Sequence, residues 1–161
     1  YGYRQRIQRE LRRAFGEDVS FVCTIDYPGT KPRLIIQWLD GPSGAAVSRL
    51  LSTWIPGHHQ EHAIWPSTQC PIGLIALNRT YSYALVAAMT NLVVGRYRLQ
   101  SPELYQMNGL PIRGSDRQQT VGGEPLWSVV DWTIRGVSAD QVPGYAALRW
   151  IYSLPTKKGS K

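Results

Sequence analysis

The segment at residues 58–62 carries the residue types and spacing that come nearest to a catalytic site. Its sequence, His-His-Gln-Glu-His, matches the inverted zinc-peptidase pattern H-x-x-E-H, in which two histidines bind zinc and the glutamate acts as a base. That chemistry needs a stable helix, and the prolines on either side leave room for at most about two turns. We therefore expect a polar loop, with a metal-dependent hydrolase at His58, Glu61 and His62 as a minor alternative.

Other catalytic patterns are weak in this sequence. Nucleophilic catalysis by a thiol would need Cys23 or Cys70 beside a histidine, and only Cys70 has histidines nearby. A structural or adventitious metal site that includes Cys70 stays open. The sequence has no glycine-rich phosphate loop, no G-x-S-x-G turn and few carboxylates that could work as a pair. We expect a protein that is not an enzyme and needs no cofactor.

The balance of charge gives the first indication of a partner. The chain has 161 residues, with 18 Lys and Arg against 11 Asp and Glu, so its net charge is +7 and its pI is about 9.7. This charge favours acidic partners, above all nucleic acid or an anionic membrane. No apolar run approaches the roughly 20 residues that span a bilayer, so we expect no transmembrane helix. Of the two kinds of acidic partner we expect nucleic acid and no membrane. Two cysteines are too few for a disulfide framework, which favours a cytoplasmic protein.

The positively charged N-terminal segment is predicted to form a helix with an arginine face. Apolar residues recur at helical spacing from Tyr3 to Phe15, and Gly16 supplies a stop. At about 100° per residue, the opposite side of the helix carries Arg6, Arg9, Arg12 and Arg13. Such a face is either an ordinary solvated helix surface or a surface that contacts backbone phosphates.

A second basic and aromatic group follows the centre of the chain. It consists of Arg79, Arg96 and Arg98, with Tyr81, Tyr83 and Tyr97 between them. These side chains could stack on bases or bind phosphates, although tyrosines also pack at sheet edges and helix ends. Trp65 lies in the proline-flanked loop and is the best candidate for an exposed aromatic that contacts a protein partner.

The elements that must position these residues begin with a predicted hairpin. Residues 19–25 alternate apolar and polar side chains, and residues 33–39 are rich in β-branched and aromatic types, so both are predicted strands. A turn-forming stretch with Pro and Gly joins them. Asp40 or Ser43 then provides the cap of a predicted helix that ends near residue 55.

A third strand and a third helix follow. Residues 73–78 are apolar enough to lie in the middle of a sheet. Ser82 would cap a largely buried helix that Gly95 terminates. These elements predict an α+β fold in the order α-β-β-α-β-α, with a small mixed or antiparallel sheet flanked by helices.

The part of the sequence after Gly95 has weaker signals. A short helix is expected from Ser101 to about Met107, followed by a polar loop over residues 112–125. Residues 126–134 fit a strand or a helix, and we favour the strand. Residues 146–154 fit either type. Together the signals predict a single domain over residues 1–155 and a flexible basic tail over residues 156–161.

Four sequence strings in the first half of the chain resemble a known family. They are Arg9-Glu-Leu-Arg-Arg-Ala-Phe15, Val19-Ser-Phe-Val22, Ile36-Gln-Trp-Leu-Asp-Gly-Pro42 and Ile75-Ala-Leu-Asn-Arg-Thr-Tyr-Ser82. Over about residues 3–82 the chain resembles the large-polyvalent-protein-associated domain family, number twenty-nine of that series. The resemblance implies a small α+β module from a long protein of a phage or conjugative element, which acts beside nucleic acid or counters host defence. It implies no catalytic residues.

Taken together, these observations predict a non-enzymatic accessory domain that binds nucleic acid, DNA in preference to RNA. The contacts are expected to go to the nucleic-acid backbone, from the arginine face of the first helix with help from Arg79, Arg96 and Arg98. The alternative is a protein-interaction module, a subunit or inhibitor in host takeover or counter-defence, whose interface includes Trp65 and Tyr97.

Overall fold

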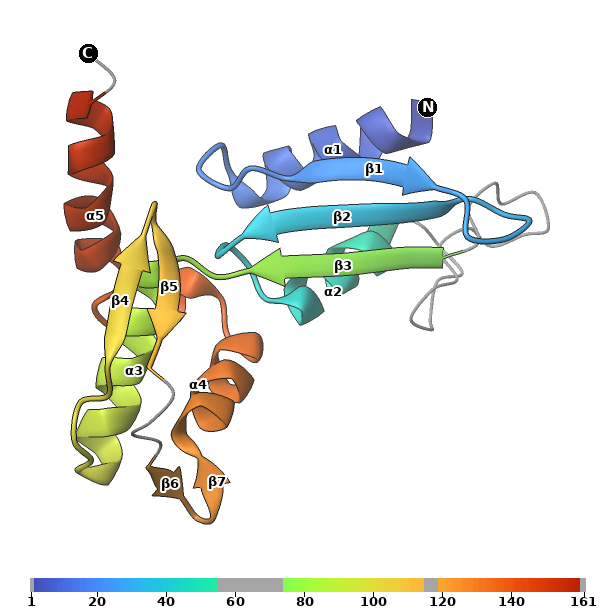
Figure 1. The fold of residues 1–161 in the computed structure, drawn as a ribbon. Coiled ribbons are helices and arrows are strands. Elements are labelled where there is room, and N and C mark those ends of the chain that lie inside the picture. The colour runs from blue at the N-terminus through green and yellow to red at the C-terminus, as the bar shows by residue number, and fades with distance from the viewer. Residues whose placement is uncertain (1, 55–73, 115–118, 160–161) are drawn as a thin grey trace. The chain divides into compact units, whose positions relative to one another are not determined.

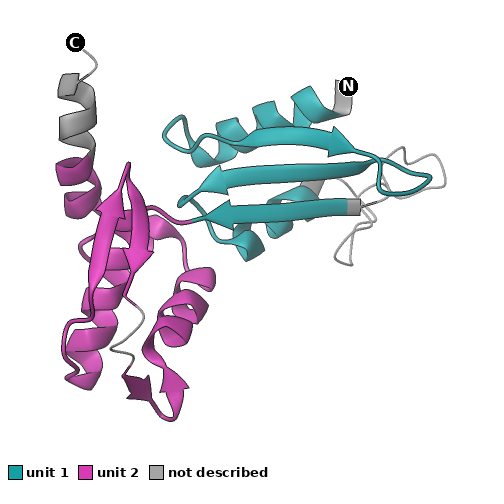
Figure 2. Ribbon diagram, in the orientation of Figure 1, with its two compact units in different colours: residues 1–80 teal, residues 81–161 magenta. Residues whose placement is uncertain are grey.

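The computed structural model describes residues 2–54, 74–114 and 119–159. The chain divides into two compact units, residues 1–80 and 81–161, which are drawn in teal and magenta in Figure 2. Each unit combines helices with small sheets, so the expected α+β class is confirmed. The single domain expected from the sequence stays a prediction, because this division describes packing and does not test independent folding.

Unit 1 contains a three-stranded sheet of β1 (Val22–Asp26), β2 (Arg33–Leu39) and β3 (Leu74–Thr80). β2 pairs antiparallel with β1, which confirms the predicted hairpin, and it pairs parallel with β3. The prediction that the third strand lies in the middle of the sheet is wrong. Among the described strands the order is β1-β2-β3, so β2 is central and β3 lies at an edge (Figure 1).

The two described helices of unit 1, α1 (Gly2–Phe15) and α2 (Gly44–Trp54), pack on one face of this sheet. Alternate residues of β2, namely Leu34, Ile36 and Trp38, are buried against them. The other buried members of this core are Ile7, Leu11, Phe21, Cys23, Val47, Leu51 and Ile75. The two described helices share one face, and of β3 only Ile75 is a buried member of the core, so this strand can lie at an edge of the sheet.

The ends of the unit 1 helices follow their predicted signals. Gly16 ends α1 in the left-handed region, with a φ of 91°, and its backbone N–H donates to the Arg12 carbonyl at 2.9 Å. Ser43 caps α2, because its hydroxyl accepts a hydrogen bond from the backbone N–H of Ala46 at 3.2 Å. Asp40, the other candidate cap, instead lies in the preceding turn with a φ of 56°.

Unit 2 is organised around α3 (Tyr83–Tyr97), whose residues 84–90 are all buried. The remaining described elements are β4 (Leu104–Met107), β5 (Leu110–Arg113), β6 (Thr120–Val121), β7 (Glu124–Pro125), α4 (Leu126–Arg135), a 3-10 turn (Ala139–Gln141) and α5 (Tyr145–Gly159). α4, α5 and the β4–β5 hairpin all pack against α3. This burial on several sides confirms the predicted buried helix.

The start of α3 confirms its predicted cap, whereas its end differs from the prediction. The Ser82 hydroxyl accepts from the backbone N–H of Leu85 at 3.2 Å. Gly95 does not terminate the helix, which continues to Tyr97. Arg98 is the residue that adopts the left-handed conformation, with a φ of 54°, and its backbone N–H donates to the Val94 carbonyl. An internal, exposed glycine is tolerated in a helix that packs on its neighbours.

The short helix expected from Ser101 to Met107 is wrong. The chain forms the antiparallel hairpin β4–β5 there, and its two-residue turn is Asn108-Gly109. Both turn residues have positive φ angles, 55° and 82°. Asn-Gly is the pair that a tight hairpin turn of this hand prefers, because glycine and asparagine enter the left-handed region at low cost.

The strand preferred for residues 126–134 is also wrong, because these residues form α4. Val130 and Ile134 are buried, as either interpretation requires, but Trp132 between them is 73% exposed. Leu126 and Trp127 complete a buried stripe at helical spacing. Packing of residues 126–134 in unit 2 therefore selects the helix. The apolar pattern of the sequence alone fits both a helix and a strand.

Two further segments of unit 2 have regular structure that the sequence did not clearly predict. The polar loop expected over residues 112–125 includes the small β6–β7 hairpin, which turns at Gly122-Gly123 with φ angles of 58° and 89°. Residues 146–154 belong to α5. The predicted tail at 156–161 starts within the last turns of this helix, and residues 160 and 161 lie outside the described ranges. No helix in those ranges is long and apolar enough to cross a membrane.

Candidate nucleic-acid interface

The predicted arginine face is present on α1. Ile7 and Leu11 on the inner side of this helix are 1% and 0% exposed, because they pack into the unit 1 core. The four arginines of the predicted face, Arg6, Arg9, Arg12 and Arg13, are all exposed. The spacing along the helix places Arg6 and Arg13 about 10 Å apart along the axis, which is long enough to reach more than one phosphate of a nucleic-acid strand.

Local contacts distinguish the arginines of α1 from one another. The Nη1 atom of Arg13 lies 3.5 Å from Oε2 of Glu10. Such an ion pair at the protein surface contributes little to stability. Arg4 is half-buried and donates to the Cys23 carbonyl at 3.4 Å, so it attaches the helix to β1. Arg6, Arg9 and Arg12 form no ion pair within the described residues.

Arg79 has a structural role. Its Nε atom donates to the Asp40 carbonyl at 2.6 Å, and its Nη2 atom donates to the Gly41 carbonyl at 3.1 Å. These bonds hold the turn between β2 and α2, which the indole N–H of Trp38 also holds by donating to the Pro42 carbonyl at 2.9 Å. Contact between Arg79 and nucleic acid stays a prediction, and the structure occupies at least two of the five guanidinium donors inside the protein.

Gly41 explains why this turn needs a particular sequence. It has a φ of 56°, and a Cβ atom at this position would lie 2.8 Å from a methyl carbon of Val19 and 3.0 Å from the Trp38 ring. Any larger residue would displace packed side chains. The Asp-Gly-Pro string that supports the family resemblance is therefore accounted for by local geometry.

Except for Arg79, which belongs to unit 1, the residues of the second predicted group belong to unit 2. Arg96 and Arg98 are exposed near the end of α3, and Tyr97 between them is 48% exposed. The other tyrosines are used in packing: Tyr83 forms an edge-to-face contact with Tyr152 at 4.8 Å between ring centroids, and Tyr81 packs against the unit 2 core. Burial, and then the hydrogen bond with Tyr152, raise the pKa of Tyr83.

The residues proposed for metal or thiol chemistry give no site in the described ranges. His58, Glu61, His62, Trp65 and Cys70 lie outside the described residues. Within those residues, no group of three or more histidine, cysteine or carboxylate side chains could hold a metal ion. Cys23 is a buried free thiol, and burial raises its pKa to about 11, against a smaller opposing effect of Arg4 and Arg12. A thiol in this state is a poor nucleophile at neutral pH.

No family model matches the chain. No curated protein and no solved structure matches it either. The resemblance over residues 3–82 therefore stays a prediction.

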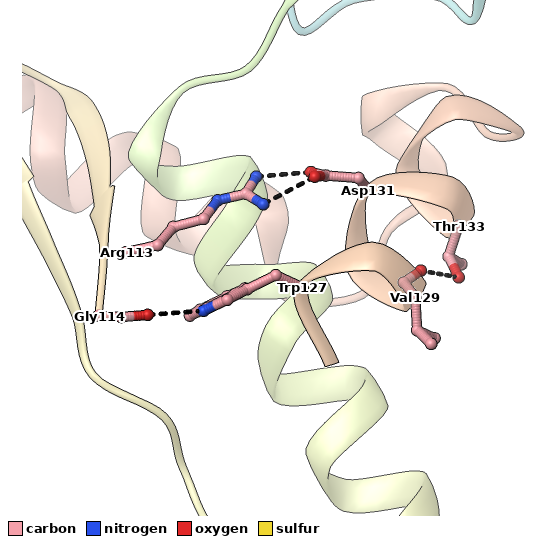
Figure 3. A network of polar contacts seen from close by, with 6 residues as sticks. All are labelled: Arg113, Gly114, Trp127, Val129, Asp131 and Thr133. Atoms are coloured by element: carbon pink, nitrogen blue, oxygen red, sulfur yellow. Dashed lines mark hydrogen bonds and ion pairs between the residues drawn. The ribbon is translucent and has the colours of Figure 1, made fainter. Parts of the chain in front are cut away.

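A second candidate surface in unit 2 was missed by the sequence interpretation. It lies on the outer side of α4, where Trp132 is exposed, and a polar network fixes this helix against β5 (Figure 3). Arg113 donates to both carboxylate oxygens of Asp131, at 2.8 and 2.6 Å. The Arg113 guanidinium lies 5.1 Å from the centre of the Trp127 ring, whose N–H donates to the Gly114 carbonyl at 2.9 Å.

Helical spacing was the signal that could have found this surface. With the interpretation of residues 126–134 as a strand, Trp132 falls on the same side as Val130 and would be buried. With the helical interpretation, it lies opposite the apolar stripe and must be exposed.

Proposed function

We propose that this protein is a non-enzymatic module that binds nucleic acid through the arginine face of α1. The observation that carries the proposal is the exposure of Arg6, Arg9, Arg12 and Arg13 on one helix whose opposite side is anchored in the core. Guanidinium groups bind phosphate in a forked geometry, and a rigid helix holds them at fixed intervals. The expected contacts go to the backbone and carry little base specificity.

The remaining features of the proposal rest on the sequence. The net charge of +7 supports an acidic partner, and DNA is proposed ahead of RNA. The origin in a phage or mobile element follows only from the resemblance over residues 3–82. A cytoplasmic location follows only from the cysteine content.

The test is to replace Arg6, Arg9 and Arg13 with glutamine and to measure DNA affinity across a range of salt concentrations. If three phosphate contacts are lost, the slope of log K against log salt becomes shallower by about 2 to 3, and affinity at low salt falls by more than tenfold. A Lys triple variant at the same positions keeps the charge and should retain the slope.

A matched control separates the α1 face from net charge. The variant Lys31→Gln, Arg49→Gln and Arg149→Gln removes the same number of charges from exposed positions elsewhere. We expect it to bind nearly as well as the unmodified protein. Equal loss in the two triple variants would contradict the proposal, because binding would then depend on overall charge alone.

One observation favours the second candidate function, a protein-interaction module. The β4–β5 hairpin has an exposed apolar face, formed by the paired residues Tyr105 and Ile112 and the paired residues Met107 and Leu110. Their side chains are between 41% and 61% exposed. A continuous apolar face of this kind is typical of a contact surface for another protein.

This second function is tested with the double variant Tyr105→Thr and Ile112→Thr. Threonine keeps the strand propensity of the hairpin and removes the large apolar groups. An interaction module would be supported by a purified partner protein that binds the unmodified chain and binds the double variant more weakly. Full retention of binding in the variant would exclude this face as the contact surface.

A further inference from the structure

A hollow of about 550 Å³ opens on the outer side of α4 and the adjoining strand β7. Its lining consists of Glu124, Ser128, Val129, Asp131, Trp132 and Arg135. Trp132 is 73% exposed, more than any other large apolar residue in the described ranges. An indole that remains in water at the rim of a hollow offers a flat face to a ligand ring.

The lining follows from the helical period of α4. Ser128, Trp132 and Arg135 are separated by four and three residues, so they form one outward stripe along the helix. A long side chain on a helix leans over the preceding turn, which places the Trp132 ring near Ser128 and Val129. Arg135 follows about one turn further along the same stripe.

A polar network between α4 and β5 holds this stripe in place. Arg113 binds both oxygens of Asp131, and Trp127 supports Arg113 through its ring while donating to Gly114 (Figure 3). The pairing neutralises Asp131, which leaves Glu124 as the other carboxylate of the lining. Within the described residues Arg135 forms no ion pair, so its charge is available at the rim.

We propose that this hollow receives one unpaired base of a single-stranded nucleic acid, with the base ring on Trp132 and a neighbouring phosphate at Arg135. Stacking on an aromatic side chain together with an arginine contact is how single strands are commonly bound. A base within a duplex is already stacked on both faces and does not reach an isolated indole. The inference rests on the proposed function and deepens it, because it names the strand class.

The net charge of unit 2 supports this occupant. Residues 81–161 hold nine lysines and arginines against five acidic residues, a net charge of +4. A positive unit attracts a polyanion over the distance of the Debye length, about 8–10 Å at physiological salt.

The test compares three variants of the full chain on a short oligodeoxythymidylate and on a duplex of the same length. Trp132→Ala should lower single-strand affinity about tenfold and leave duplex affinity unchanged. Trp132→Phe keeps a stacking ring and should retain most of the affinity. Trp150→Ala, which removes another exposed tryptophan on α5, is the matched control and should bind like the unmodified protein. Circular dichroism and thermal unfolding check that all three are folded.

The outcomes separate this inference from the α1 interface. Unchanged single-strand affinity in Trp132→Ala overturns the hollow as a base site and leaves the α1 interface standing. Equal loss on single strand and duplex also overturns it, because a stacking site discriminates between them. If the α1 triple variant binds DNA as the unmodified protein does, the proposed function fails independently of Trp132. If Trp132→Ala impairs only the binding of a purified protein partner, the hollow is a protein site and the inference is wrong.

Discussion

Arg79 shows how a residue that looks like a ligand contact can be required for the fold. Its guanidinium donates to two backbone carbonyls of the turn that leads into α2. Replacing Arg79 with glutamine should lower the free energy of unfolding by about 1.5–3 kcal/mol, because charged donors are lost from partly buried carbonyls.

Urea denaturation measures this change, with Arg49→Gln as a control for loss of a positive charge at an exposed position of unit 1. If Arg79 also contacts nucleic acid, as the sequence predicts, the folded Arg79 variant should bind DNA more weakly than the control. Equal affinities would limit Arg79 to its structural role.

Cys23 gives a prediction about reactivity and pH. Burial raises its pKa from the ordinary value of 9.0 to about 11, so the thiol remains protonated in the folded protein at neutral and mildly alkaline pH. In a Cys70→Ser background, we expect iodoacetamide to label Cys23 at pH 8 only as fast as the protein unfolds. Rapid labelling of the folded protein would contradict burial of this thiol.

The same shift has a consequence for stability. Because the folded pKa is the higher one, the contribution of Cys23 is fully present below pH 9 and is lost as the pH rises toward about 11. Chemical denaturation at pH 8 and pH 10.5 should show a fall in stability. The fall should be smaller in Cys23→Ala.

At the scale of elements, the end of α3 stores strain at a candidate contact residue. Arg98 has a φ of 54°, a conformation that costs a residue with a side chain about 1 kcal/mol more than glycine. Arg98→Gly should therefore raise the free energy of unfolding by about that amount, as measured by thermal or urea denaturation. Gly95→Ala is the companion variant, and it should also stabilise the helix, since Gly95 is internal and a Cβ there meets nothing within 4 Å.

The arginine in this strained position also permits a test of its role. If Arg98 contributes to binding, the more stable Arg98→Gly variant should bind DNA more weakly than Gly95→Ala. Equal affinities would remove Arg98 from the candidate interface.

Elements with local signals were predicted well from the sequence. α1, β2 and α2 have clear apolar periods with capping or stop residues, and the structure places them close to the expected bounds. The β4–β5 hairpin had a signal too, in the pair Asn108-Gly109 between apolar residues. The pair Ser101-Pro102 is a competing signal, because it is typical of the start of a helix.

Other features depend on partners far along the chain and carry no local signal. The alternation of residues 126–134 fits both periods, and only packing on α3 selects the helix. Likewise, the acceptors of Arg79 lie near residue 40, so its structural role could not be inferred from its own neighbours. The arginine face of α1 was predictable because the residues that form it and the residues that bury its other side belong to one helix.

At the scale of the whole molecule, the two units have cores that share no described residue. We expect core truncations to act on one unit first. Ile36→Ala should destabilise unit 1, and Leu85→Ala should destabilise unit 2, each by about 2–5 kcal/mol.

Hydrogen exchange followed by mass spectrometry can assign each loss of protection to residues 1–80 or 81–161. Loss of protection in both units at the same denaturant concentration, for either variant, would instead show one cooperative domain. That result would bear out the single domain predicted from the sequence.

The parallel pairing of β2 with β3 sets an order for folding. The antiparallel hairpin joins Asp26 to Arg33 across a short turn, whereas Arg33 meets Leu74 only after residues 34–73 have been closed into a loop. Closing the longer loop costs more chain entropy, so β3 should join the sheet late. During synthesis the hairpin and α1 can therefore form while one edge of β2 still has unpaired backbone groups. Until residue 80 has left the ribosome, that edge is open to association with another copy of the chain.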